Sequence, residues 1–349
     1  SPVDPGNGKK VYFTYSEYNP TTFAGVAWPN NPAGKNAMLS ESAALYYAFS
    51  GDTRVLDVAK ALLDHQLQYG TTPPTHNWGN VPYSTGAAGS LSSGNDNLRE
   101  GAGVIEPDKV AELGYDGYLQ MYKITGDTRY RDAAIACANE LAANIRTGTS
   151  SVSPWPYRVN AQTGAVVENY SAHVISAIQL FDELIRLNLG NVASYTTART
   201  ATWNWLIANP MANGRWTQYF EDVPIQTNQF TNLNQYAPGQ TAIYMLQNQS
   251  KDASWKAHVE TLSDFIVDNF GNDDYGDLGM YRGARTISEQ VEYKYKMASH
   301  TSRFGAMMAL YAAATGDAAA KDTAYRSLNW ATYMARNNGS VNEGPAEFA

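Results

Sequence analysis

The sequence predicts an all-α fold made of antiparallel helical hairpins, and two observations carry this prediction. An apolar helical stretch followed by Ser/Thr-Gly-Asp and a second helical stretch occurs three times, with the turns at 50–52, 125–127 and 315–317. The spacing is also regular, because the first helices of five expected hairpins begin 62 to 71 residues apart, near residues 36, 107, 170, 236 and 298. Such a period is typical of repeated supersecondary units. We therefore expect five or six hairpins in a ring, with the more apolar first helices buried as the inner ring and the amphipathic second helices outside.

Each Gly-Asp turn has a physical basis, for which the second unit serves as the example. A glycine such as Gly126 ends a helix easily, because it tolerates the left-handed conformation. The following Asp127 can cap the next helix through its side-chain oxygen. Beyond it, Ala134, Ala138 and Leu141 recur at the spacing of one helix face. Each unit therefore reads as a tight helix-turn-helix hairpin.

Two further hairpins lack this turn, and long links join all five. One pairs about 170–188 with about 193–208, and the other pairs about 236–249 with about 251–269. Because the hairpins are antiparallel, the long links emerge at one end and lead into the first helices. Long ordered loops in a compact domain are usually functional, so the site is expected at that end. The links are 69–106, 147–169, 209–235 and 270–297.

Composition limits the class of protein. The 349 residues are 44% hydrophobic, which is enough for one domain over residues 1–349 with a lead-in segment at 1–20. No run approaches the roughly 18 apolar residues of a membrane helix, so no membrane partner is expected. The net charge of −8, with Lys and Arg not gathered in blocks, argues against nucleic acid. The 24 Tyr, 8 Trp and few charges indicate a secreted protein, extracellular or periplasmic, which we expect to be a monomer.

The helix-(Ser/Thr)-Gly-Asp-helix units and their layout resemble the (α/α)-toroid carbohydrate-active enzymes. These include several glycoside hydrolase families, the unsaturated glucuronyl hydrolases, the sugar 2-epimerases and the α/α-type polysaccharide lyases. The resemblance covers nearly the whole chain, and the sequence matches the catalytic signature of no single family. It implies a glycan-degrading enzyme with an oligo- or polysaccharide substrate. Such toroids commonly have six hairpins, whereas five are found in this sequence.

Polar and ionisable groups gather where the long links enter the first helices. Helix caps explain some of them. His173, His300 and Arg303 need another explanation, because positive charge at a helix N-terminus opposes the helix dipole. We therefore expect one cleft shared by these positions.

Aromatic residues crowd the same links. A sugar ring stacks on aromatic faces, while its hydroxyls bind Asn, Gln, Asp and Arg. The segment from Trp155 to Arg158, followed by Tyr170, is the densest cluster and the favoured binding wall. The substrate-binding candidates are Trp78, Trp155, Tyr157, Arg158, Trp216, Asn234, Tyr236, Gln240 and Arg303.

Glycoside hydrolysis is the first mechanism that the sequence indicates. It needs two carboxyl groups, one as acid and one as base or nucleophile. Glu106 and Asp108 follow two apolar residues directly at a helix start, where partial burial would raise the pKa of a general acid. Asp108 also fits a plain helix cap. Further acids in similar positions are Glu41, Glu112 and Glu168.

Two alternatives stay open. A polysaccharide lyase or uronate epimerase must neutralise a uronate and move a proton, for which Tyr170, His173 and His300 are candidates beside Arg158 and Arg303. A non-catalytic glycan-binding module is the other alternative. No cofactor is expected, although the acidic run at 272–277 could bind calcium through oxygen ligands without EF-hand spacing.

Overall fold

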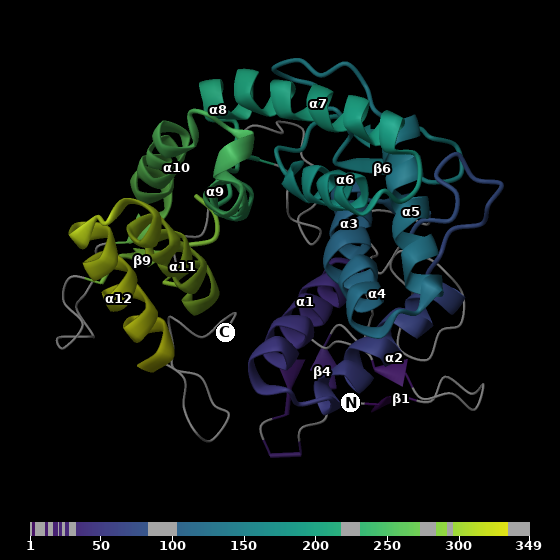
Figure 1. The fold of residues 1–349 in the computed structure, drawn as a ribbon, viewed down its shortest axis with the longest axis horizontal. Helices are drawn as coiled ribbons and strands as arrows, with labels where there is room; N and C mark the ends of the chain where they lie inside the picture. The colour runs from purple at the N-terminus through teal and green to yellow at the C-terminus, as the bar shows by residue number, and fades with distance from the viewer. Residues whose placement is uncertain are drawn as a thin grey trace. The chain divides into compact units, whose positions relative to one another are not determined.

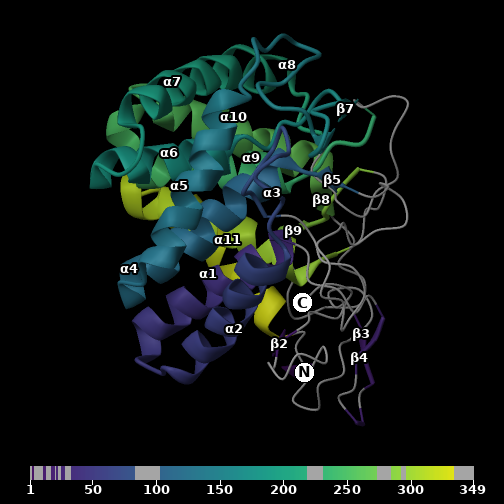
Figure 2. The ribbon, with the colours of Figure 1, turned by 90° about the vertical axis from the view of Figure 1, so that its right-hand side faces the viewer.

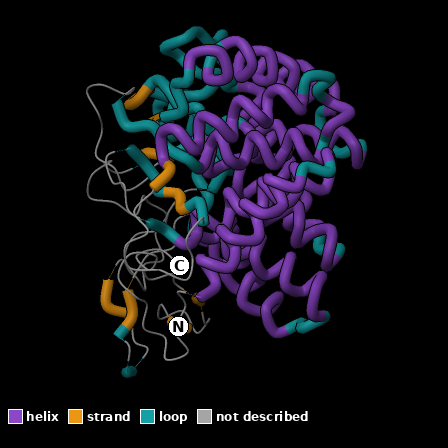
Figure 3. Tube along the Cα trace, turned by 90° about the vertical axis from the view of Figure 1, so that its left-hand side faces the viewer, coloured by secondary structure: helices purple, strands orange, loops and turns teal. Residues whose placement is uncertain are grey.

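A computed structural model describes residues 33–82, 103–217, 231–272, 284–291 and 296–333, together with short pieces within the first 27 residues. The described chain is mainly helical, as predicted (Figure 3, purple). It divides into two compact units: unit 1 holds the described residues up to Leu206, and unit 2 those from Ile207 onward. The single domain over residues 1–349 stays a prediction. None of the helices in these ranges is long and apolar enough to cross a membrane.

Unit 1 contains three hairpins (Figure 1). The first helix of the second hairpin is continuous but changes type, because a π-helical segment, η1, separates α3 from α4. The elements are α1 (Ala33–Ser50), α2 (Arg54–Tyr69), α3 (Pro107–Glu112), η1 (Leu113–Leu119), α4 (Gln120–Thr125), α5 (Thr128–Ala143), α6 (Ile175–Leu187) and α7 (Val192–Ala208), which ends just beyond the unit boundary.

Unit 2 contains two hairpins, in which α9 packs on α10 and α11 packs along α12 (Figure 1). Helix α9 also packs on α11, so the two first helices are neighbours. The elements are α8 (Pro210–Asn213), α9 (Tyr236–Gln247), the 3-10 turn η2 (Gln249–Lys251), α10 (Trp255–Phe270), α11 (Ala298–Thr315) and α12 (Ala318–Tyr333).

The three predicted Gly-Asp turns are confirmed, and they share one hydrogen-bond pattern. Gly126 has a φ of +73°, in the left-handed region that glycine tolerates. The Thr125 hydroxyl donates to the Met121 carbonyl at 2.7 Å and accepts from the Asp127 N–H at 3.2 Å. The Asp127 carboxylate then accepts from the Arg129 N–H at 3.0 Å and so caps α5. The same pattern recurs at Ser50-Gly51-Asp52 and at Thr315-Gly316-Asp317.

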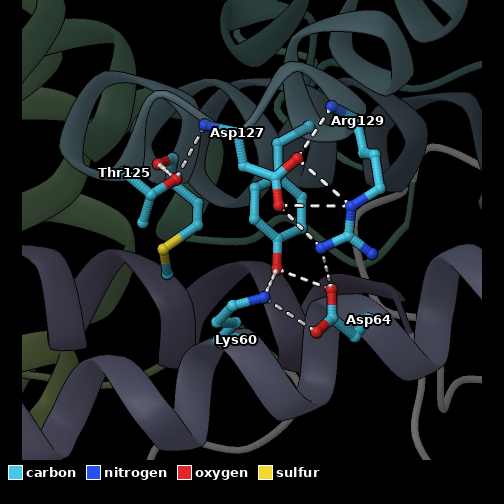
Figure 4. Close-up of polar contacts among 7 residues, drawn as sticks. Lys60, Asp64, Thr125, Asp127 and Arg129 are labelled. Carbon is cyan, nitrogen blue, oxygen red and sulfur yellow. Dashed lines mark hydrogen bonds and ion pairs between the residues drawn. The ribbon is translucent and has the colours of Figure 1, made fainter.

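A polar cluster joins the outer helices of the first two hairpins (Figure 4). The Arg129 guanidinium contacts Asp127 at 2.6 Å and Asp64 of α2 at 3.2 Å. Asp64 also accepts from Lys60 at 3.0 Å and from the Tyr130 hydroxyl at 2.8 Å. Because these charges are partly exposed, each ion pair contributes roughly 0–1 kcal/mol. The cluster fixes how α5 lies on α2 more than it adds stability.

Short strands hold the ends of the long links together. In unit 1, β5 (Val104–Ile105), β6 (Arg158–Asn160) and β7 (Val166–Glu168) form an antiparallel sheet in that order. In unit 2, β8 (Gly271–Asn272) pairs with β9 (Thr286–Ile287) within one link, and Asn234 of the preceding link forms a bridge with Gln290. These strands lie to one side of the helices of their own unit (Figure 2). The expected meeting of long links is therefore confirmed within each unit. The N-terminal pairs are β1 (Pro2–Val3) with β2 (Val11–Tyr12), and β3 (Glu17–Tyr18) with β4 (Gly25–Ala27).

The expected burial of the first helices holds for α6 and fails for part of α1. Helix α6 buries most of its length, as predicted. The second half of α1 instead exposes Leu45, Tyr46 and Phe49, the last by 87%. The cause is packing, because the helices that contact α1 most, α2, α3, η1 and α4, cover its other side.

Candidate functional site

The first cluster of candidate residues forms where a strand of unit 1 runs directly into a helix. Glu106 has the extended backbone of β5 and stands as the residue before α3. Pro107 occupies the first helical position, where its missing N–H costs nothing. Asp108 accepts a hydrogen bond from the Lys109 N–H at 2.8 Å. The sequence correctly indicated a carboxylate at a helix start, and all of these side chains are buried.

Arg158 holds two of the candidate acids. Its Nε donates to Glu106 Oε1 at 3.1 Å, and its Nη1 donates to Glu168 Oε2 at 3.0 Å. The three-stranded sheet brings them together, because Arg158 pairs with Glu168 across β6 and β7 while β6 also pairs with β5. The guanidinium is fully buried. The guanidinium therefore joins the two carboxylates in one buried ion-paired group.

A second buried network lies one turn along α3. Lys109 Nζ donates to Glu112 Oε2 at 3.1 Å, and His173 Nε2 lies 2.8 Å from Glu112 Oε1. The Ser176 hydroxyl is 3.2 Å from the same His173 nitrogen. Burial raises the pKa of Glu112, but Lys109 and His173 outweigh burial and hold it at about 2. Glu112 is therefore a fixed negative charge. The approach of Lys109 also needs Gly34, because a Cβ there would lie 2.7 Å from Lys109 Cδ.

Asp116 on η1 is the acid that sequence reasoning missed. Burial, together with the carboxylates of Glu41 on α1 and of Glu112, raises its pKa well above the ordinary value. No basic side chain in the described ranges pairs with Asp116. It follows Asp108 and Glu112 at steps of four residues, which places the three acids along one side of the helix. That four-residue spacing of acids was the signal available in the sequence.

The aromatic candidates of the binding wall lie inside the units, which corrects that interpretation. Trp155 donates its indole N–H to the Leu141 carbonyl at 2.8 Å, and Tyr170 packs on Trp205 with ring centroids 5.7 Å apart. Tyr157 lies beneath the Arg158 guanidinium. A sugar needs an exposed ring face, and these rings fill the core because their links fold back onto the helices. The buried aromatic candidates are Trp78, Trp155, Tyr157, Tyr170, Trp216 and Tyr236.

Unit 2 builds a second cluster where the link before α9 meets the link before α11. The Gln235 N–H donates to the Glu289 carbonyl at 2.8 Å, which joins the two links. Gln235 Oε1 lies 2.9 Å from His300 Nδ1, and His300 Nε2 lies 3.8 Å from Glu289 Oε1. The Arg303 guanidinium stands 4.1 Å from the ring centre of Tyr236. Burial, and then Arg303, lower the pKa of His300 well below the ordinary value.

The other candidates of unit 2 differ in their exposure and contacts. Asn234 is buried, and its Oδ1 accepts from the Ala237 N–H at 3.1 Å, while its Nδ2 donates to the Trp216 carbonyl at 3.2 Å. These bonds make it a structural cap of α9. Gln240 is partly exposed on α9. Trp216 packs on Phe265 at 6.5 Å between ring centroids.

The predicted catalytic residues thus divide between the two units. Unit 1 holds Glu106, Asp108, Tyr170 and His173, and unit 2 holds His300. The single cleft shared by both sets stays a prediction. Within the described ranges no three acid, His or Cys side chains gather as metal ligands. Residues 273–277 of the expected calcium loop lie outside those ranges.

Comparisons with known proteins identify the fold. No protein-family model and no curated protein matches the chain. Among solved structures, cellobiose 2-epimerase from Spirochaeta thermophila is 10% identical with a TM-score of 0.64, covering 99% of this chain and 84% of the other. A family 76 glycoside hydrolase from a bovine Bacteroides thetaiotaomicron strain is 14% identical with a TM-score of 0.62, covering 100% and 70%. An unsaturated glucuronyl hydrolase specific for heparin is 12% identical with a TM-score of 0.57, covering 99% and 84%.

These structures are all (α/α)-toroids of carbohydrate-active enzymes, so the chain has the predicted fold class. At 10 to 14% identity, the likeness shows the fold alone. Function has to be argued from the site.

Proposed function

We propose that this protein is a carbohydrate-active enzyme, and specifically a glycoside hydrolase, with Asp116 as the general acid. The single observation that carries the proposal is the contrast between Glu112 and Asp116 on one side of the same helix. Glu112 is held ionised by Lys109 and His173, whereas the pKa of Asp116 is raised. Neighbouring carboxyl groups whose environments push their pKa values apart mark an acid and its charged partner.

Hydrolysis would then use three acids in different roles. Asp116, whose raised pKa favours the protonated form, donates its proton to the oxygen of the leaving sugar. Glu41 lies on α1, the helix that packs against η1, and its carboxylate acts as base or nucleophile. Glu112 touches neither proton nor sugar in this scheme, and its fixed charge adds to burial and to Glu41 in raising the pKa of Asp116. It is a positioning residue.

Glu106 and Asp108, the acids that the sequence indicates first, are weaker choices for the acid. The Arg158 guanidinium at 3.1 Å favours the charged form of Glu106. Asp108 already accepts the Lys109 N–H. Either could still serve as an ionised carboxylate.

The fold supports a glycan substrate, because the similar structures carry names of enzymes that act on carbohydrates. The low proportion of charged residues and the high tyrosine content support export from the cell. We therefore propose an extracellular or periplasmic enzyme that acts on an oligo- or polysaccharide.

Elimination or epimerisation is the second candidate, and His300 favours it. When His300 Nδ1 donates to Gln235 Oε1, the other nitrogen, Nε2, becomes the acceptor. Burial keeps the ring neutral. A neutral imidazole with a fixed tautomer can remove a proton from a sugar carbon beside a carboxylate.

The test compares Asp116→Asn with Asp132→Asn, a matched change at an exposed position of α5. Each protein is incubated with a panel of neutral and uronate-containing polysaccharides, and new reducing ends and ultraviolet absorbance are followed. We expect reducing ends without absorbance, and a loss of roughly 10²–10⁴-fold for Asp116→Asn only, as for a missing general acid.

The other outcomes are decisive as well. Full activity in Asp116→Asn removes it as the acid. Rising absorbance of an unsaturated uronate, lost in His300→Gln, establishes the lyase instead. Glycan binding without any product supports the non-catalytic binding module.

A further inference from the structure

The Arg303 side chain of α11 is held in place without a carboxylate partner. In the part of the chain that the structure describes, its contacts are the face of Tyr236 at 4.1 Å and the Nδ1 atom of His300 at 3.4 Å. A ring-face contact uses no lone-pair acceptor, so it orients the guanidinium while leaving N–H donors for another partner. Arg303 is partly exposed, whereas Tyr236 beneath it is buried. The Arg303 guanidinium is therefore held in one position where a ligand can reach it.

A buried amide donor lies beside this arginine. Gln235 has no exposed surface, yet its Nε2 atom has no hydrogen-bond partner among the residues that the structure describes. An unpaired buried N–H group costs roughly 1–3 kcal/mol, so a native structure needs a reason to keep one. Gln235 Nε2 and Arg303 Cδ both border the point where a Cβ of Gly239 would lie, at 2.9 and 3.4 Å. The two side chains therefore converge over Gly239.

The opposite side of the cluster suits a hydroxyl group. Glu289 Oε1 is an acceptor, and His300 Nε2 is an acceptor when Nδ1 donates to Gln235. A hydroxyl hydrogen can bond to either atom across the 3.8 Å between them. The cluster thus offers positive charge and N–H donors on one side, and acceptors on the other.

We infer that unit 2 binds a sugar acid, with its carboxylate on Arg303 and Gln235 Nε2 and a neighbouring hydroxyl on Glu289 and His300. A guanidinium recognises a carboxylate through paired charge-assisted hydrogen bonds. The negative charge of Glu289 directs the carboxylate to the arginine side. Only the sugar part of the ligand rests on the proposed function.

The test measures binding of D-glucuronate and D-galacturonate by isothermal titration calorimetry, with D-glucose, D-galactose and acetate as comparison ligands. Three variants of the full chain are compared. Arg303→Met removes the charge, and Gly239→Ala keeps it but places a methyl group against Gln235 and Arg303. Arg326→Met, on the exposed face of α12, is the matched control. Circular dichroism confirms that each variant folds.

We expect a uronate to bind at least about tenfold more tightly than its neutral sugar, because charge-assisted pairs are roughly twice as strong as neutral ones. Arg303→Met and Gly239→Ala should abolish this preference, and Arg326→Met should keep it. Equal binding of uronate and neutral sugar overturns the inference. If acetate binds as tightly as the uronate, the site recognises a carboxylate alone, and the inference that its ligand is a sugar is wrong. If Arg303→Met does not fold, Gly239→Ala decides.

The two proposals fail separately. Uronate binding that depends on Arg303, without hydrolysis of any glycan, supports this inference and rules out the proposed hydrolase function. Hydrolysis that depends on Asp116, without a preference for uronates, does the reverse.

Discussion

Replacing Arg158 by Met should destabilise unit 1 more than any surface change. The guanidinium is fully buried and contacts Glu106 at 3.1 Å and Glu168 at 3.0 Å, so its removal takes one cation from two buried carboxylates. Removing one partner of a buried ion pair costs about 3–5 kcal/mol. The folded state of a domain is stable by only about 5–15 kcal/mol. The variant should therefore lose about a fifth or more of a typical margin.

The assay is equilibrium unfolding in urea at pH 7, followed by tryptophan fluorescence and far-ultraviolet circular dichroism. Arg131→Met is the matched control, because its ion pair with Asp132 is exposed and contributes roughly 0–1 kcal/mol. A further variant that combines Arg158→Met with Glu106→Gln and Glu168→Gln should regain part of the loss, since no unbalanced buried charge is left. The reasoning is refuted if Arg158→Met costs no more than Arg131→Met, or if the combined variant is the least stable.

Two further predictions concern pH and a turn. The pKa of Glu112 is lowered to about 2, so its contribution to the free energy of unfolding is complete above the ordinary value of 4.5 and is lost as the pH falls toward 2. Urea titrations across that range should show that the free energy of unfolding of the wild type falls as the pH falls. An equal fall in Glu112→Gln would contradict the prediction. Gly126→Ala should cost about 1–2 kcal/mol, because φ is +73° and the added Cβ meets no atom within 4 Å, which leaves backbone strain alone. An unchanged urea midpoint would show that the turn tolerates alanine.

The hairpins could be predicted because their signals are local. Gly126 ends a helix, Asp127 caps the next one, and both effects act within a few residues of sequence. Helix boundaries that depend on neighbouring strands and turns were less predictable. Helix α6 begins at Ile175 and not near residue 170, because the chain before it forms β7 and a buried turn.

Only part of the site could be predicted, because its ion pairs join residues that are far apart in the sequence. Arg158 meets Glu106 only through the register of a three-stranded sheet, and no local pattern encodes that pairing. The aromatic composition of the links indicates sugar binding, but it does not say which way each ring faces, so Trp155 and Tyr170 were misread. Asp116 lies within a helix and not at a helix start, and its environment depends on burial and on Glu41 from another helix, which no local pattern encodes.

The π-helical segment Leu113–Leu119 gives this helix an unusual tolerance of a change in length. A π turn holds about one residue more than an α turn. Deleting one residue between Glu112 and Asp116 would let the segment close into ordinary α-helix, while the parts before and after it keep their facing. The same deletion in a regular helix such as α5 would rotate its two parts by about 100° relative to each other. In the shortened π-helical segment, Glu112 and Asp116 would be three residues apart, a spacing that still places them on one side of a helix. This helix can therefore lose one codon without dismantling the row of acids.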